Sequence, residues 1–357
     1  MRKKNYIGID LGHHTLKVVQ IERQPQGWKV VRVGVCPTPS GAIREGVVVD
    51  VPTLAAALRQ LIKNTGITSK YGVVSVQGGS VVVRTVRIPQ MTEAVLRKSI
   101  RYEVGRYIPT SVEDSYVEFE ITNEKADETQ MEVLIVAAPK DLVESRLSAC
   151  ALAGIDVEVV DIGPFAAYRS LVEMNDLTDT QDETLAMIDF GANNTTVSVI
   201  CKGNFVLTRT VQNGSANLTE ALKTFFDLTS EDAEAGKAQL NVGDLLEESP
   251  KENPPLRVLH PYIDELVREI RRSINYYESQ QTDGTAPTPV SKVVLTGGGA
   301  KMTGIDRYLS DKLGISVEST GVFDNPRVLN FTPTELGNGA DFTVASGLAM
   351  RPWLRAS

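Results

Sequence analysis

The fold is decided by the stretch IDFGANNTTVSVI, residues 188–200, which contains an apolar strand, a polar turn with one glycine, and a second β-branched strand. The stretch IDLGHHTLKVV, residues 9–19, has the same order of features near the N-terminus. In both stretches the first strand ends at an aspartate, and a glycine follows two residues later, so two parts of the chain repeat one unit. The equivalent residues are Asp10 and Asp189, and Gly12 and Gly191.

A third stretch, VVLTGGGAKMTGIDRYL at residues 293–309, is an apolar strand that leads into three glycines and then a helical pattern. Glycine at the junction of a strand and a helix lets a ligand approach the backbone N–H groups closely. The stretch differs from the dinucleotide-binding pattern GxGxxG, because Met302 stands at the place of the last glycine. The phosphate-binding pattern GxxxxGK[ST] does not occur in the chain.

The two aspartates predict a magnesium site, because Mg²⁺ keeps several of its waters and is bound well by carboxylates that act through water. We expect Asp10 and Asp189 to hold hydrated Mg²⁺ and a triphosphate between two domains. One such hairpin alone would be interpreted as an Asp-Gly strand end without a ligand, but two copies and the glycine-rich strand favour a phosphate site. The turns supply donors for phosphate oxygens. The predicted phosphate-binding residues are Gly12, His13, Thr15, Lys17, Gly191, Asn193, Asn194 and Thr195.

Composition excludes several functional classes. The 357 residues carry a formal net charge of −8, and an acidic chain does not attract nucleic acid or anionic lipid. The three cysteines form no CxxC pattern, so neither a disulfide framework nor a zinc site is expected. The N-terminal residues lack the apolar stretch of a signal peptide, and no segment reaches the roughly 18 apolar residues of a membrane span. We therefore expect a cytoplasmic protein that only a partner holds at the membrane.

Residues 85–157 have the pattern of a small inserted α+β domain: a strand, a helix, two strands, a second helix and a final strand. A long amphipathic helix in the second half is expected to begin at Pro261. The predicted domains are residues 1–84 with 158–182 and 336–357 for the first half, residues 85–157 for the inserted domain, and residues 183–335 for the second half, including an outer subdomain at 216–290.

The two hairpins and the glycine-rich strand together resemble the superfamily of actin, hexokinase and heat-shock chaperones, whose members bind ATP. The resemblance implies an α/β fold with duplicated actin-like (ribonuclease H-like) halves around a nucleotide cleft, and a small inserted α+β domain in the first half. Lys17, seven residues after Asp10, matches the phosphate-contacting lysine of actin-like members. Residues 161–167 and 345–349 look like the two segments that connect the halves at a hinge.

The same resemblance implies contacts to adenosine. The three glycines correspond to the adenosine loop, and Glu234 and Lys237 stand on a helical stretch where actin-like members contact ribose and adenine. An exposed charged helix face is the alternative for these two residues. The residues implied to bind adenosine are Glu234, Lys237, Gly297, Gly298, Gly299 and Met302.

Longer phrases resemble the PilM family, which comprises actin-like proteins of type IV pilus assembly related to FtsA. These phrases are EGVVVDVPTLAAALRQLI (45–62), VRTVRIPQMTEAVLRKSIRYEVGRYIP (83–109) and NGSANLTEAL (213–222). The resemblance implies a platform regulated by ATP or ADP with Mg²⁺, which binds the N-terminal cytoplasmic peptide of the inner-membrane protein PilN in a groove by the inserted domain. FtsA-like proteins end in an amphipathic membrane-targeting helix, whereas this chain ends MRPWLRAS, so we expect a membrane link through the partner alone.

The sequence pattern for catalysis is weaker than the pattern for nucleotide binding. Several members of the superfamily carry an acidic residue just before the proline of the first connecting segment, but Gly163 precedes Pro164 here. Asp161 is the nearest carboxylate and the candidate catalytic residue, with a capping or turn role as the alternative. The sequence therefore predicts slow or partner-dependent ATP hydrolysis at most.

Two other functions remain as alternatives. One is an FtsA-like filament-forming cell-division protein, and the missing amphipathic C-terminal helix argues against it. The other is a small-molecule kinase of the same superfamily, which needs a carboxylate to deprotonate a substrate hydroxyl. The sequence shows no second polar cluster that would supply this carboxylate.

Overall fold

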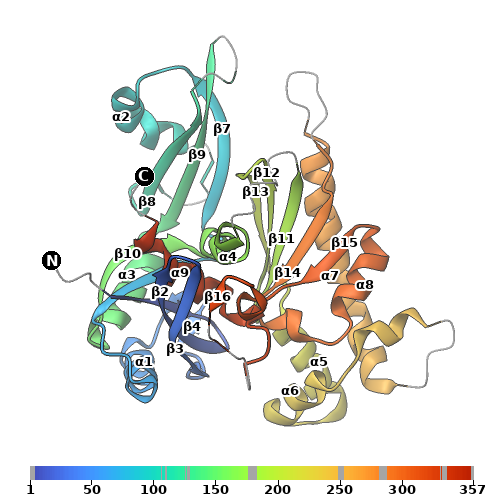
Figure 1. The fold of residues 1–357 in the computed structure, drawn as a ribbon. Helices are drawn as coiled ribbons and strands as arrows, with labels where there is room; N and C mark the ends of the chain where they lie inside the picture. The colour runs from blue at the N-terminus through green and yellow to red at the C-terminus, as the bar shows by residue number, and fades with distance from the viewer. Residues whose placement is uncertain are drawn as a thin grey trace. The chain divides into compact units, whose positions relative to one another are not determined.

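The chain forms two compact units in the computed structural model (Figure 1). Unit 1 contains Met1–Arg169, Gly203–Thr208 and Val344–Ser357, and unit 2 contains Ser170–Lys202 and Arg209–Thr343. The expected domain boundaries at residues 182 and 335 fall outside the described residues. The structure describes residues 5–105, 107–108, 111–124, 126, 129–175, 183–247, 253–280, 288–329, 331 and 336–354.

Unit 1 is built on a mixed sheet in which five strands follow the order β10-β6-β1-β2-β3. β1, β2 and β3 pair antiparallel in succession, while β6 pairs parallel with both β1 and β10. The predicted N-terminal hairpin is confirmed, and it places Asp10 directly opposite Lys17. The strands are β1 (Tyr6–Leu11), β2 (Thr15–Gln24), β3 (Gly27–Pro37), β6 (Tyr71–Val76) and β10 (Asp156–Ile162), with a small hairpin of β4 (Ile43–Arg44) and β5 (Val47–Val48).

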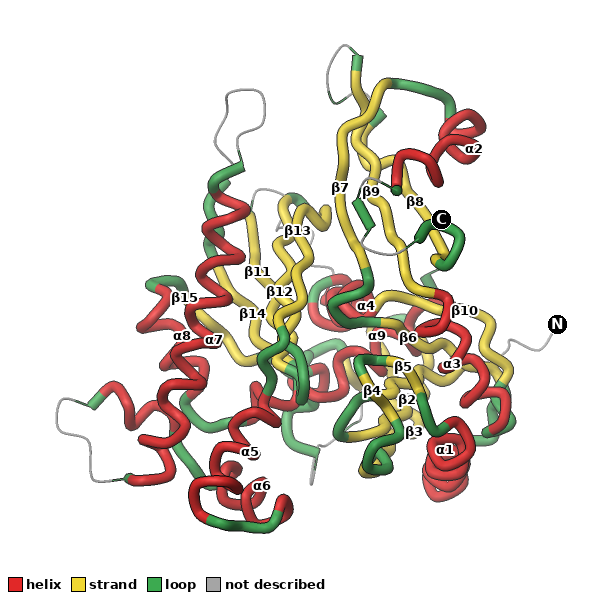
Figure 2. The backbone as a smooth tube through the Cα atoms, turned by 180° about the vertical axis from the view of Figure 1, so that it is seen from behind, coloured by secondary structure: helices red, strands yellow, loops and turns green. Residues whose placement is uncertain are grey.

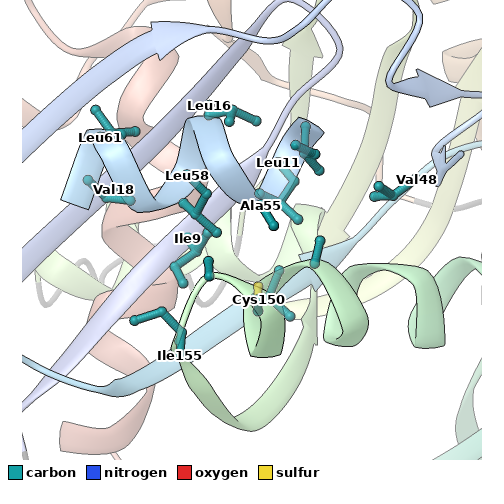
Figure 3. Packing of buried hydrophobic residues seen from close by; sticks show 14 of the residues in the cluster. Ile9, Leu11, Leu16, Val18, Val48, Ala55, Leu58, Leu61, Cys150 and Ile155 are labelled. Carbon is teal, nitrogen blue, oxygen red and sulfur yellow. The ribbon is translucent and has the colours of Figure 1, made fainter. Parts of the chain in front are cut away.

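Helix α1 (Val51–Thr65) packs on this sheet beside α3 (Lys140–Leu152), as Figure 2 shows from behind. Its ends have clear local causes, because the Asp50 carboxylate accepts the Thr53 N–H at 3.1 Å and Gly66 stops the helix with a φ of 68°. Figure 3 shows Leu58, Ile9 and Cys150 together in the core between these elements. Truncation of a fully buried leucine such as Leu58 costs about 2–5 kcal/mol of stability.

A separate small module within unit 1 consists of a three-stranded antiparallel sheet, in the order β7-β9-β8, and helix α2 (Figure 1). It has its own apolar cluster, in which Leu96 and Ile100 of α2 pack against strand residues such as Ile135. The elements are β7 (Val82–Pro89), α2 (Glu93–Val104), β8 (Ser115–Asn123) and β9 (Gln130–Pro139).

Residues 140–157, which the sequence pattern groups with the inserted domain, lie on the larger sheet instead. Helix α3 packs against α1, and β10 pairs with β6. The sequence hides this change because β9 ends at Pro139 and α3 begins at Lys140, so no linker marks where the small module ends.

Unit 2 contains a second mixed sheet, in which four strands follow the order β12-β11-β14-β15. Read in reverse, this order matches unit 1, because an antiparallel hairpin, β11 and β12, lies beside two parallel strands, β14 and β15. Asp189 then takes the place that Asp10 has in unit 1, so the expected repeat is confirmed. The strands are β11 (Thr184–Phe190), β12 (Thr195–Cys201), β13 (Asn204–Val211), β14 (Lys292–Thr296) and β15 (Ser316–Ser319), and a short strand β16 (Val328–Leu329) follows later in the chain.

The long amphipathic helix of unit 2 begins earlier than the sequence predicts. Helix α7 starts at Pro254, where the Asn253 side chain accepts the Leu256 N–H at 3.1 Å, and Pro261 lies inside the helix. The prediction of a start at Pro261 was wrong because one interior proline removes only one backbone hydrogen bond, while Leu256 already begins the buried stripe. The helices of unit 2 are α5 (Ser215–Phe226), α6 (Ser230–Ala238), α7 (Pro254–Glu278) and α8 (Ile305–Leu313).

The chain leaves unit 1 within α4 (Gly163–Leu171) and returns at the start of α9 (Thr343–Met350). The parts of these helices that belong to unit 1 pack very closely, because a Cβ on Gly347 would lie 1.7 Å from the Ala166 carbonyl oxygen. The segments expected to connect the halves are therefore neighbours in space. Among the described helices, none combines the length and the apolar content that a bilayer crossing requires.

Candidate functional site

Turn 1, residues 12–14, joins β1 to β2 and lies above a buried ion pair. Lys17 Nζ is 3.3 Å from Asp10 Oδ2, and both side chains are 9% exposed. The two residues are cross-strand neighbours, so their spacing in the sequence puts both side chains on one face of the hairpin. The Thr38 hydroxyl donates to the Gly12 carbonyl oxygen at 2.7 Å, which fixes the turn. A side chain at Gly12 would place its Cβ 2.7 Å from the Thr15 carbonyl oxygen, so this turn requires glycine.

Arg146 of α3 is a candidate site residue that the sequence analysis missed. Its side chain is buried, its Nη1 donates to the Leu11 carbonyl oxygen at 3.3 Å, and its Nε has no hydrogen-bond partner among the described residues. Burial lowers the pKa of Arg146 to about 10, and the charge of Asp10 opposes this shift. A signal was present, because Arg146 stands on the buried stripe between Val143 and Cys150, where an arginine is unusual.

His13 connects turn 1 to the hairpin of β4 and β5. The Gly46 N–H donates to His13 Nε2 at 3.2 Å, so a neutral imidazole carries its proton on Nδ1. Burial lowers the pKa of His13, the charge of Arg146 lowers it further, and Asp10 opposes the shift. Turn 1 is therefore lined by two cations, one carboxylate and a neutral imidazole, and this excess of positive charge suits a phosphate group.

Turn 2, residues 191–194, joins β11 to β12 in unit 2. The first residues of α5 pack against it, with the Ser215 N–H donating to the Gly191 carbonyl oxygen at 2.9 Å and the Ala216 N–H donating to that of Ala192 at 2.8 Å. Gly214 allows this approach, because a Cβ there would lie 2.1 Å from the Ala192 carbonyl oxygen. The partial positive charge of this helix N-terminus therefore lies beside turn 2, while its first N–H groups are engaged with the carbonyl oxygens of the turn.

The residues predicted to bind phosphate differ in the exposure and the hydrogen bonding of their side chains. Asn193 is exposed, and Thr15 and Asn194 are half-buried. The hydroxyl of Thr195 is buried and donates to the Asn213 carbonyl oxygen at 2.5 Å, so its proton is already engaged. The sequence could not show this, because Asn213 is 18 residues away in the chain.

The glycine-rich turn after β14 lies against the end of β11. A Cβ on Gly297 would lie 2.4 Å from Asp189 Oδ1, and a Cβ on Gly299 would lie 2.3 Å from the ring of Phe190. Glycine at these positions therefore makes room for the Asp189 carboxylate. Gly298 is exposed with no atom within 4 Å of its Cβ position, and the buried Met302 closes the turn.

Glu234 and Lys237 are not on a simple exposed helix face. Lys237 is 5% exposed, and its Nζ donates to the Ser215 carbonyl oxygen at 3.2 Å, to Thr219 Oγ1 at 2.9 Å and to Glu234 Oε2 at 2.8 Å. These contacts fix α6 to the start of α5, which in turn holds turn 2. The structure therefore brings all the predicted residues of unit 2 into one connected region.

Asp161 lies at the end of β10 and is closely surrounded by cations. Its Oδ2 is 3.0 Å from Arg169 Nη1 and 3.7 Å from Arg351 Nε, and its Oδ1 accepts the Ile162 N–H at 2.8 Å. Arg169 also donates to the Gly347 carbonyl oxygen at 3.0 Å, which ties α4 to α9. These contacts connect the end of β10 to Arg169 of α4 and to Arg351, as the alternative of a structural role for Asp161 predicts.

The residues present fit a polyphosphate with a divalent cation. In unit 1, Lys17 and Arg146 supply buried positive charge at turn 1. In unit 2, a helix N-terminus meets turn 2, and the space at Gly297 holds the Asp189 carboxylate. Asp10 in unit 1 and Asp189 in unit 2 are each carboxylates of the kind that hold hydrated Mg²⁺.

Comparison with solved structures shows the fold. The chain is similar to a structure described as "PilM-PilN type IV pilus biogenesis complex", with a TM-score of 0.83, 26% identity, and coverage of 97% of this chain and 98% of that chain. MreB5 of Spiroplasma citri bound to ADP is also similar, with a TM-score of 0.55, 11% identity and 99% coverage of both chains. The expected actin-like α/β fold is confirmed by these likenesses.

Sequence comparison identifies the family. Cell division protein FtsA of Bacillus subtilis (strain 168) is 23% identical over 347 residues, which cover 86% of this chain and 76% of FtsA. The profile of the family described as "Type IV pilus assembly protein PilM" matches residues 8–353, which is nearly the whole chain. The chain therefore belongs to the PilM family of type IV pilus assembly proteins.

Proposed function

We propose that the protein binds ATP or ADP with Mg²⁺ and acts as a nucleotide-regulated platform of type IV pilus assembly, on which the N-terminal cytoplasmic peptide of a PilN-type protein docks. The observation that carries nucleotide binding is the repeated unit, in which two equivalent strands end in Asp10 and Asp189 and lead into polar turns that each contain a glycine. Turn 1 would contact phosphate with help from Lys17, and turn 2 would contact phosphate beside the N-terminus of α5.

The adenosine part of the ligand is assigned to unit 2. The proposed contacts are the turn of Gly297, Gly298 and Gly299 with Met302, together with Glu234. Lys237 would contribute from its buried position, since its three hydrogen bonds already fix α6 against the start of α5. ADP in the similar MreB5 structure supports a nucleotide as the ligand class.

The proposed partner rests on the similar PilM-PilN complex. We assign the docking region to the small module of β7, β8, β9 and α2, which has its own apolar core. Docking on the cytoplasmic end of a membrane-anchored partner would place this protein at the inner membrane.

Calorimetric titration with ATP and with ADP, each with and without Mg²⁺, tests the nucleotide site. Wild type should bind both nucleotides, and Mg²⁺ should strengthen the binding of ATP. Asp10→Asn and Asp189→Asn should weaken the magnesium-dependent part by about tenfold or more, because each removes a carboxylate that holds the hydrated cation. Asp311→Asn, at an exposed position, is the matched control and should behave as wild type. Wild type that binds neither nucleotide would refute the proposal.

A further inference from the structure

Gln77 directly follows β6, the strand between β1 and β10. All three strands run parallel, and the pairs Ile9 with Val74 and Ile162 with Val76 are in register. Gln77 therefore stands at the same edge of the sheet as turn 1. In α/β proteins the ligand binds at this edge, outside the carboxyl ends of the parallel strands.

The Gln77 side chain fills the space that a side chain at position 163 would occupy. A Cβ built on Gly163 would lie 2.1 Å from Gln77 Oε1 and 3.1 Å from its Cδ. Position 163, just before Pro164, is the position at which several members of the superfamily that the chain resembles carry an acidic residue. In this chain it is a glycine. A polar amide from the neighbouring strand thus takes the place of the missing carboxylate.

The oxygen of this amide has no hydrogen bond within the protein. Gln77 Oε1 is buried and has no partner among the described residues. A buried acceptor without a partner is unfavourable, and a bound water is the usual way to satisfy it. Gln77 is also close to turn 1, because the Cβ position of Gly46 is 3.3 Å from the Gln77 carbonyl oxygen and the Gly46 N–H binds His13.

Asp161 is the competing candidate for contact with a reactive water. Its Oδ1 accepts the Ile162 N–H, and its Oδ2 lies beside the charged Arg169 and Arg351. Asp161 Oδ2 and Gln77 Oε1 are both buried without a hydrogen-bond partner among the described residues, but the two arginines already compensate the Asp161 carboxylate. An amide oxygen orients a water by accepting one of its protons in a hydrogen bond, and it does not remove that proton.

We propose that Gln77 positions the water that hydrolyses ATP in this protein, an inference that rests on the proposed nucleotide binding. The water oxygen forms a bond to the γ-phosphorus while the bond from that phosphorus to the bridging oxygen of ADP breaks. One hydrogen of the water stays on the inorganic phosphate, and the other proton passes to solvent. Since Gln77 takes up no proton, this role predicts slow hydrolysis.

Two substitutions test the role of Gln77 without removing any predicted nucleotide ligand. Gln77→Met keeps the length of the side chain and removes the amide. Gly163→Ala forces the flexible end of Gln77 to move, because the new methyl group needs the space of Oε1. Gly79→Ala is the matched control, since a Cβ there meets nothing within 4 Å.

The main readout is affinity for ADP with and without aluminium fluoride, which with ADP mimics the phosphoryl group in transfer and needs no turnover. Wild type should bind ADP about tenfold more tightly when aluminium fluoride is present, as one added hydrogen bond predicts. Gln77→Met and Gly163→Ala should lose this gain while their affinity for ADP alone and their melting temperature stay close to wild type. The double variant should be no worse than either single variant, because both act on one amide. The rate of ATP hydrolysis should fall in the variants that lose this gain in affinity.

A gain in Gln77→Met equal to that of wild type would overturn the assignment, and so would a wild type that shows no gain while it binds ADP. Independent, additive losses in the double variant would also overturn it. Failure of wild type to bind ADP at all is a different result, because it refutes the proposed nucleotide site and not the role of Gln77 alone.

Discussion

Arg146 carries a positive charge in a place where burial makes the charge unfavourable. Its guanidinium makes a hydrogen bond of 3.3 Å to the Leu11 carbonyl oxygen, and its Nε is left without a partner among the described residues. A buried ion of this kind lowers stability unless another charge compensates it. Asp10 compensates in part but also faces Lys17. The anionic ligand proposed for turn 1 would complete this balance of charge.

Arg146→Met should separate stability from binding. ATP affinity should fall by about tenfold, which corresponds to about 1.4 kcal/mol, because a buried cation beside the phosphates is lost. The melting temperature should stay equal or rise, since an incompletely paired buried charge is replaced by an apolar side chain. Titration calorimetry and thermal unfolding measure the two effects. Arg97→Met, on an exposed pair with Glu93, is the control, and unchanged ATP affinity in Arg146→Met would contradict the account.

His13 should make the protein sensitive to acid. The pKa of His13 in the folded protein lies below the usual value of about 6.5, so between these two values the unfolded chain binds more protons. The contribution to stability is fully present above the unfolded pKa and is lost as the pH falls through the folded pKa. Protonation of Nε2 also removes the acceptor of the Gly46 N–H.

Urea unfolding at about pH 7.5 and about pH 5 checks this sign. Wild type should lose stability on acidification, and His13→Gln should lose less, while exposed His14→Gln should retain the wild-type response. An equal loss of stability on acidification in wild type and His13→Gln would show that the lowered pKa of His13 does not cause the acid sensitivity.

Single residues were predictable where the strand register alone sets their position. Asp10 and Lys17 are neighbours because the hairpin turn fixes their register, and Asp189 follows the same rule in the second copy. Arg146 and Gln77 were not predictable, because their importance depends on contacts with segments far away in the chain.

At the scale of elements, α9 is held by contacts that only small residues permit. A Cβ on Gly8 of β1 would lie 1.9 Å from the Ala345 carbonyl oxygen, and one on Gly347 would lie 1.7 Å from that of Ala166. The colliding atoms belong to backbone, which cannot move aside as a side chain can. The close packing of β1, α4 and α9 therefore depends on these two glycines.

Gly8→Ala and Gly347→Ala should each destabilise the protein by about 1–3 kcal/mol or more, since overpacking forces backbone shifts. Gly236→Ala is the matched control, because it lies within α6 and its Cβ would meet nothing within 4 Å. That change should be neutral or stabilising by up to about 1 kcal/mol through helix propensity. Chemical denaturation measures all three, and a neutral Gly8→Ala would refute the close packing.

Strong local end signals define an element in the sequence, whereas elements without such signals are harder to delimit. Helix α1 has a capping Asp50 and a terminal Gly66, so its sequence defines both ends. The start of α7 was missed because the general rule for proline favours a helix start, and the cap at Asn253 was not recognised. The place of α3 on the larger sheet follows from packing between Cys150 and α1, which no local pattern reports.

At the scale of the whole molecule, the repeat of sequence corresponds to a repeat of structure. The strand order β10-β6-β1-β2 of unit 1 matches the order β15-β14-β11-β12 of unit 2. By strand register, Val74 of β6 corresponds to Leu295 of β14, so Gln77 is equivalent to Gly298, which gives the two units different chemistry at equivalent strand ends. The two hairpins revealed the repeat from sequence alone, whereas the assignment of strands to each sheet needed the structure.

The central claim, that nucleotide controls the binding of a partner peptide, is tested most directly by calorimetry. A synthetic peptide from the N-terminus of the cognate PilN-type protein would be titrated into wild type, Asp189→Asn and the control Asp311→Asn, with and without Mg-ATP. Wild type should bind the peptide saturably, with an affinity that Mg-ATP changes by about fivefold or more, as coupling between two sites predicts. Asp189→Asn should still bind the peptide but lose this dependence. Peptide affinity that is the same with and without bound Mg-ATP in wild type would contradict the account.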